Sequence, residues 1–113
     1  MRHGDVLERL SQEIHGPREL YLKWEQVVRR YKRGEKTKLA QIRASINKQG
    51  KTQADIQSET YAHPDFIEYL AEWDHADREY TRAKVAYDNL ETDLEAYRSA
   101  LAFDRDTARA FGG

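Results

Sequence analysis

The sequence predicts an all-α protein: a long antiparallel helical hairpin of coiled-coil character, joined by a short connector helix. Three observations support this: a 3.5-residue apolar repeat, residues near position 50 that are typical of the end of one helix and the start of the next, and the composition. The 113 residues form one domain, with 39% hydrophobic against 35% charged residues and a mean hydropathy of −0.96. This balance is typical of a thin core. The 11% aromatic content and the net charge of −1 argue against disorder.

A short helix is expected at residues 5–15. Asp5 suits its N-cap, and the apolar residues of this segment recur at helical spacing. Gly16 and Pro17 interrupt the pattern, because proline cannot donate the backbone hydrogen bond of a continuing turn. We therefore expect a kink or short break at 15–17.

The first long arm is expected at residues 17–49. Its first apolar stripe consists of Leu20, Trp24, Val27 and Tyr31. A second stripe, shifted around the helix, consists of Val28, Glu35, Leu39, Ile42 and Ile46. Gly34 lies near the shift. Because glycine costs about 1 kcal/mol in a helix interior, it indicates a bend or a close approach of the partner backbone.

The stretch "NKQGKTQAD" predicts the turn between the arms. Gly50 suits a left-handed C-cap, and Thr52 with Asp55 resembles a capping box that opens a connector helix at 52–62. Pro64 suits the first position of a second long arm at 64–111.

A regular repeat runs through this second arm. Its apolar and aromatic residues step alternately by three and four: Trp73, Ala76, Tyr80, Ala83, Tyr87, Leu90, Leu94, Tyr97 and Leu101. This 3.5-residue period is the signature of a left-handed coiled-coil seam. Two arms of similar length on either side of a connector predict a hairpin.

Tyrosine suits half-buried seam positions, because its ring packs while its hydroxyl reaches water or a partner group. The aromatic residues are therefore either core residues of a thin hairpin or an interface covered by a second copy. A dimer, with a four-helix arrangement, is the expected state. The candidate seam residues are Trp24, Tyr31, Trp73, Tyr80, Tyr87, Leu90, Leu94, Tyr97 and Leu101.

Charge is unevenly distributed. Residues 29–51 contain nine Lys or Arg and one acid, whereas residues 64–97 contain ten acids and three bases. One interpretation is charge pairing beside the seam, which fixes helix orientation. A second is a nucleic-acid patch with Tyr31 as a stacking ring. A third is that the acidic face engages a basic partner protein. The nine candidate nucleic-acid-binding residues are Arg29, Arg30, Lys32, Arg33, Lys36, Lys38, Arg43, Lys48 and Lys51.

No catalytic, metal or cofactor pattern stands out. There are no cysteines, the four histidines lack metal-ligand spacing, and "RYKRGEKTK" lacks the second glycine of a phosphate loop. We therefore expect neither an enzyme nor a bound cofactor. With no long apolar run and no signal-peptide pattern, we expect a cytoplasmic protein that makes no membrane contact.

Residues 50–109 resemble a group of short phage and prophage proteins. The resemblance rests on a G-K-T-Q-A connector, a Pro-Asp-Phe start to the last helix, an E-Y-x-x-A-K-x-x-Y stretch and a later Y-R-S. The matching residues are Gly50, Lys51, Thr52, Gln53, Ala54, Pro64, Asp65, Phe66, Glu79, Tyr80, Ala83, Lys84, Tyr87, Tyr97, Arg98 and Ser99. The resemblance implies a helical hairpin with an accessory role in phage DNA metabolism.

Two functional hypotheses follow. The first is a non-enzymatic, self-associating phage accessory protein that binds DNA, or a DNA–protein complex, in recombination or replication. The second is an adaptor or inhibitor that binds a host or phage enzyme through its aromatic and acidic helical face. Lys51, Lys84, Arg98 and Arg105 are the polar positions that the resemblance marks for testing first.

Overall fold

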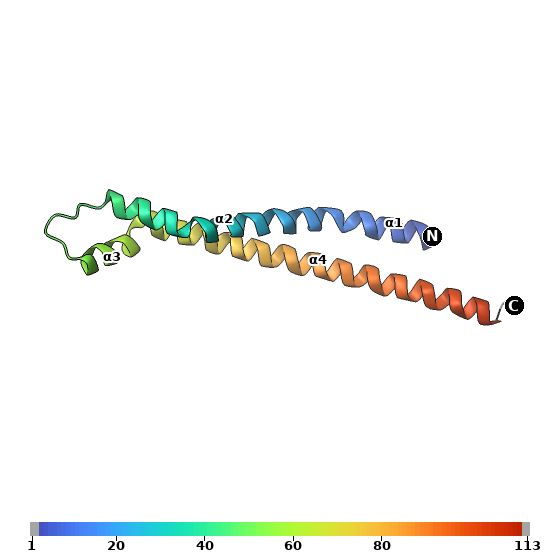
Figure 1. Ribbon diagram of the computed structural model, residues 1–113. Helices are drawn as coiled ribbons and strands as arrows, with labels where there is room; N and C mark the ends of the chain where they lie inside the picture. The colour runs from blue at the N-terminus through green and yellow to red at the C-terminus, as the bar shows by residue number, and fades with distance from the viewer. Residues whose placement is uncertain (1–2, 112–113) are drawn as a thin grey trace. The chain divides into compact units, whose positions relative to one another are not determined.

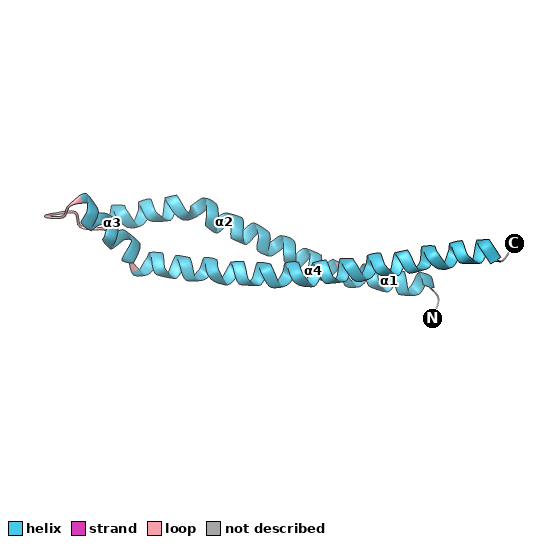
Figure 2. Cartoon of the chain, turned by 90° about the horizontal axis from the view of Figure 1, so that it is seen from below, coloured by secondary structure: helices cyan, strands magenta, loops and turns pink. Residues whose placement is uncertain are grey.

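The computed structural model describes residues 3–111 and shows the predicted all-α helical hairpin (Figure 1). Four helices follow one another: α1 (His3–Glu13), α2 (His15–Ser45), α3 (Gln53–Ala62) and α4 (Pro64–Phe111). Within the described range the segments between helices are short loops, and no strand occurs (Figure 2). None of the described helices has the length and apolar character needed to cross a membrane.

The chain divides into two compact units, and both long helices run through the division. One unit is Trp24–Tyr80, and the other combines Met1–Lys23 with Thr81–Gly113. In the Trp24–Tyr80 unit, the C-terminal part of α2 packs antiparallel to the start of α4. Its core consists of Ile42, Ile46 and Phe66, with Leu39 and Tyr69 packed against them.

The other unit has a thinner core. On the described part of α4 within it, only Ala83 and Leu94 are buried, and the remaining seam residues are half-buried. Tyr21 of α2 stacks on Tyr87 of α4, with ring centroids 5.6 Å apart and planes 4° from parallel. Large flat rings thus cover a seam that two helices alone leave partly open to water.

The repeat predicted on α4 agrees with the burial pattern. Every member from Trp73 to Leu101 is buried or half-buried, and almost all the residues between them are exposed. The helix is also continuous over 48 residues, from Pro64 to Phe111. A 3.5-residue period keeps one face toward the partner helix along its length, and this explains the agreement.

The first arm differs from the prediction at both ends. The break between α1 and α2 lies at Ile14, not at 15–17. Pro17 lies in the first turn of α2 and does not interrupt it, because the N–H that proline lacks would have no acceptor within that helix. At the other end α2 stops at Ser45 rather than at residue 49. There the Asn47 side-chain oxygen accepts a hydrogen bond from the Gln49 N–H at 3.1 Å, a local turn that competes with the helix.

Gly50 has the expected left-handed conformation, with φ of +73°. It does not cap the helix, however. Gly50 instead lies in a turn of the loop that follows α2, and the Lys51 N–H donates to the Lys48 carbonyl across this turn at 3.2 Å. Glycine is suited to this position because side chains with a Cβ atom rarely adopt a positive φ.

The buried face of α2 differs from the two predicted stripes at one position, Leu20. Leu20 is 47% exposed, and Tyr21 takes the seam position instead. One set of half-buried or buried residues steps by three and four past Gly34: Ile14, Pro17, Tyr21, Trp24, Val28, Tyr31, Glu35, Lys38 and Ile42. Glu25, Val27, Gly34 and Leu39 beside it are half-buried as well. Glu35 and Lys38 belong to this face although they are charged, because their aliphatic stems can pack while their charges remain solvated.

The connector helix begins with the predicted capping box. The Thr52 hydroxyl accepts from the Asp55 N–H, and the Asp55 carboxylate accepts from the Thr52 N–H, both at 3.1 Å. These hydrogen bonds hold the pKa of Asp55 below its ordinary value of 3.8. The pKa of Asp55 is lower in the folded than in the unfolded protein. The capping box therefore contributes fully to the free energy of unfolding above pH 3.8, and this contribution is lost as the pH falls through the folded pKa.

Replacing Thr52 with alanine is expected to lower the free energy of unfolding by about 1 kcal/mol, because the Asp55 N–H at the start of α3 loses its acceptor, the Thr52 hydroxyl. Urea unfolding followed by circular dichroism measures this. Exposed Ser58, within the same helix, is the matched control, and its replacement by alanine should change stability by less than about 0.5 kcal/mol. Equal losses at both positions would contradict the assigned cap.

Candidate nucleic-acid interface

Five of the nine candidate cations lie on one face of α2. They recur at positions i, i+3, i+4, i+7 and i+14, a spacing that places side chains on the same side of a helix. All five are exposed. We call this set the basic face, and it consists of Arg29, Lys32, Arg33, Lys36 and Arg43.

The basic face points away from the seam, and its interactions are local. Arg29 pairs with Glu25 at 2.7 Å, one turn earlier in α2. The Arg33 Nε–H donates to the Arg29 carbonyl at 3.4 Å, and Arg43 donates to the Gln53 side-chain oxygen of α3. Lys32 and Lys36 form no ion pair within the described chain.

Ion pairing across the seam, which the first of the three interpretations of the charge pattern favoured, does not occur for these side chains in the described part of the chain. Among the described residues, none of the nine cations pairs with a carboxylate of α4. For the five cations of the basic face the reason is geometric: side chains that point away from the seam cannot reach the helix on which α2 packs. The positive charge of this arm consequently stays on the surface.

The other four cations are dispersed. Arg30 and Lys38 project from other sides of α2, and Lys38 is half-buried. Lys48 is exposed in the loop, whereas Lys51 pairs with Glu59 of α3 at 2.5 Å. The structure therefore does not gather all nine candidates into one patch.

Tyr31, the predicted stacking ring, lies in the seam. Its hydroxyl donates to the Glu72 carboxylate at 3.2 Å, and its ring meets the edge of Tyr69 at a centroid distance of 5.2 Å. Burial, followed by the hydrogen bond to Glu72, raises the pKa of Tyr31 above 10.0. A ring held in this way is not available to stack on a base.

Gly34 makes room for this arrangement. The Tyr69 hydroxyl donates to the backbone carbonyl of Tyr31, and a Cβ atom at Gly34 would approach the Tyr69 oxygen to 3.1 Å. The close approach expected at Gly34 thus comes from a partner side chain rather than from the partner backbone. Burial also raises the pKa of Tyr69.

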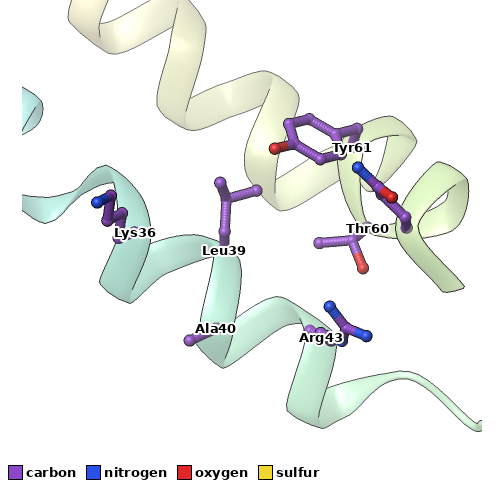
Figure 3. A pocket seen from close by; sticks show the side chains of 7 residues that line it. Lys36, Leu39, Ala40, Arg43, Thr60 and Tyr61 are labelled. Carbon is purple, nitrogen blue, oxygen red and sulfur yellow. The ribbon is translucent and has the colours of Figure 1, made fainter. Parts of the chain in front are cut away.

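A hollow between α2 and α3 adjoins the basic face (Figure 3). Its volume is about 390 Å³, and it is lined by Lys36, Leu39, Ala40, Arg43, Gln57, Thr60 and Tyr61. Sequence reasoning missed Gln57 and Tyr61. Helical periodicity relates residues within one helix, and no signal in it shows that α3 folds back against α2.

A second hollow lies between α2 and α4 within the Trp24–Tyr80 unit. Its volume is about 450 Å³, and it combines aromatic with acidic side chains. The edge of Trp24 meets His75 at a centroid distance of 5.8 Å. We call this the acidic groove, and its lining residues are Trp24, Val27, Tyr31, Glu68, Ala71, Glu72, His75 and Ala76.

The remaining candidate seam residues hold the helices together. Trp73, Tyr80, Tyr87, Leu90, Tyr97 and Leu101 are half-buried, and Leu94 is buried. Of the positions marked by the resemblance, Lys84 and Arg105 are exposed, and Arg98 pairs with Glu95 at 3.0 Å.

Among the residues that the structure describes, no group of three or more His, Cys, Asp or Glu side chains is placed to hold a metal ion. Comparison of the chain with protein-family models, with curated proteins and with solved structures finds no match.

Proposed function

We propose that this protein is a non-enzymatic accessory protein that binds DNA through the basic face. The observation that carries the proposal is the set of five exposed cations on one side of α2, none of them paired with α4. From Arg29 to Arg43 the helix rises about 21 Å, the length of about six base-pair steps. One helix face therefore spans several phosphates of a DNA backbone.

The net charge of −1 is compatible with such binding. At physiological ionic strength the Debye length is about 8 Å, so that a phosphate in contact with the basic face responds mainly to nearby charges. The acids of α4 project from a different helix. They favour one orientation, in which α2 faces the nucleic acid.

A salt series tests the proposal. Binding of a labelled DNA duplex is measured by fluorescence anisotropy at several salt concentrations. Phosphate contacts release about 0.9 counterions each, so five contacts predict a slope of about −4.5 in a plot of log K against log salt. Absence of binding at the lowest salt, or affinity that does not change with salt, would contradict the proposal.

The resemblance of residues 50–109 to short phage and prophage proteins supports a setting in phage DNA recombination or replication. The dimer stays a prediction. It rests on the half-buried tyrosines of the seam, which a second copy would cover further. Sedimentation of the protein used in the salt series, with and without DNA, gives the number of copies in each state.

The acidic groove favours a second candidate function, binding of a basic segment of a partner protein. Glu68 has no partner within the described chain, and Glu72 accepts only the Tyr31 hydroxyl. Lys or Arg side chains are attracted both to carboxylates and to the faces of aromatic rings. Because Trp24 lines the groove, a change in tryptophan fluorescence on addition of an arginine-rich peptide is the readout for this function.

A further inference from the structure

We infer that the hollow between α2 and α3 is a subsite for single-stranded nucleic acid, in which Tyr61 stacks on one unpaired base. This inference rests on the proposed DNA binding and specifies the form of nucleic acid. The supporting observation is that the Tyr61 ring is held in place but remains exposed. It lines the hollow together with Lys36 and Arg43, and no carboxylate lines that hollow.

Tyr61 has the properties of a stacking platform. Tyr61 is 52% exposed although it is a large aromatic residue. Phe66, which is only 3% exposed, meets the Tyr61 ring edge-on at 5.6 Å and 87°. The contact with a core residue holds the ring in place, so that little conformational freedom is lost when a base stacks on it.

The lining of the hollow favours an anionic, planar ligand. Lys36 and Arg43 stand seven residues apart on the basic face, about 10 Å along the helix. Leu39 and Ala40 provide apolar surface between them. Figure 3 shows the Arg43 side chain reaching toward α3 and Leu39 extending from α2 on the side of Tyr61. Phosphates thus fit the ends of the hollow, and a base fits its middle.

Polar groups remain to contact the nucleotide. Gln57 has no partner in the described chain, so that its amide can donate to and accept from a base edge. Arg43 uses one nitrogen toward Gln53 and keeps other N–H groups for a phosphate. The Thr60 hydroxyl, by contrast, already donates to the Ile56 carbonyl at 2.7 Å.

A single strand fits this site better than a duplex. Bases in a duplex are stacked on their neighbours and paired, and only an unstacked base can lie flat on a protein ring. The volume of about 390 Å³ also falls in the range of pockets that take small ligands. Duplex DNA would contact the basic face without entering the hollow.

Tyr61→Leu and Tyr61→Phe test the subsite. Both variants and the unmodified protein are titrated with a labelled single-stranded oligonucleotide, and separately with the duplex of the same sequence, at one fixed salt concentration. Loss of one stacked base predicts about 5- to 150-fold weaker single-strand binding for Tyr61→Leu. Tyr61→Phe should bind normally because it keeps the ring, and duplex affinity should stay unchanged in both.

Gln57→Glu provides a second variant that leaves the ring and its packing intact. The new carboxylate next to the phosphates should also weaken single-strand binding while the protein unfolds at the normal urea concentration. Unchanged single-strand affinity in both Tyr61→Leu and Gln57→Glu, or equal losses for single strand and duplex, would overturn the subsite and leave the proposed function standing. If the unmodified protein binds neither form, the proposed function itself fails.

Discussion

Replacing Phe66 with alanine is expected to lower the free energy of unfolding by about 3–5 kcal/mol. Phe66 is 3% exposed and belongs to the core cluster with Ile42 and Ile46. Its ring also meets those of Tyr61 and Tyr69. Because small domains are stable by only about 5–15 kcal/mol, this loss removes a large part of the total.

Urea unfolding followed by circular dichroism measures the effect. The neighbouring Ile67 is the matched control: it is also a large apolar residue in the first turns of α4, but it is 56% exposed. Its replacement by alanine should change stability by no more than about 0.5 kcal/mol. Faster hydrogen exchange in α3 should accompany Phe66→Ala, because Tyr61 loses its contact with the core. Comparable losses at the two positions would show that the assigned packing is wrong.

Replacing Lys32, Arg33 and Lys36 together with glutamine is expected to weaken duplex DNA binding about 100-fold at about 0.15 M salt. The three side chains are exposed, and none pairs with a carboxylate in the described chain. Their neutralisation removes phosphate contacts without breaking an ion pair. The slope of log K against log salt should become shallower by about 2.7.

A triple variant with the same charge change elsewhere is the control. Lys84, Arg98 and Arg105 of α4 are exposed, and glutamine at all three should leave binding unchanged. If this control loses affinity and the basic-face variant does not, the interface lies on α4, at the positions marked by the resemblance. If the unmodified protein binds the arginine-rich peptide but binds no DNA, the acidic groove is favoured as the functional site.

Features encoded over a few neighbouring residues could be predicted from the sequence. The seam of α4 is one, because a 3.5-residue repeat from Trp73 to Leu101 defines a continuous face whatever the partner is. The connector helix is another, because its cap joins Thr52 and Asp55, three residues apart. The excess of Lys and Arg in residues 29–51 could likewise be predicted from the sequence, although the arrangement of these side chains around the helix could not.

The candidate site required the tertiary structure. Periodicity alone does not show whether Leu20 or Tyr21 faces the seam, and only contact with Tyr87 selects Tyr21. Tyr31 was predicted to be a stacking ring, but its contacts with Tyr69 and Glu72 hold it in the seam.

The sequence by itself thus determined the helices and the charge of each arm, because hydrogen bonds and caps within a helix act over three or four residues. Only the tertiary structure decided which rings are enclosed and which, like Tyr61, stay open beside cations. That choice depends on how side chains of different helices pack against one another, and these contacts join residues far apart in the chain, such as Tyr31 and Tyr69.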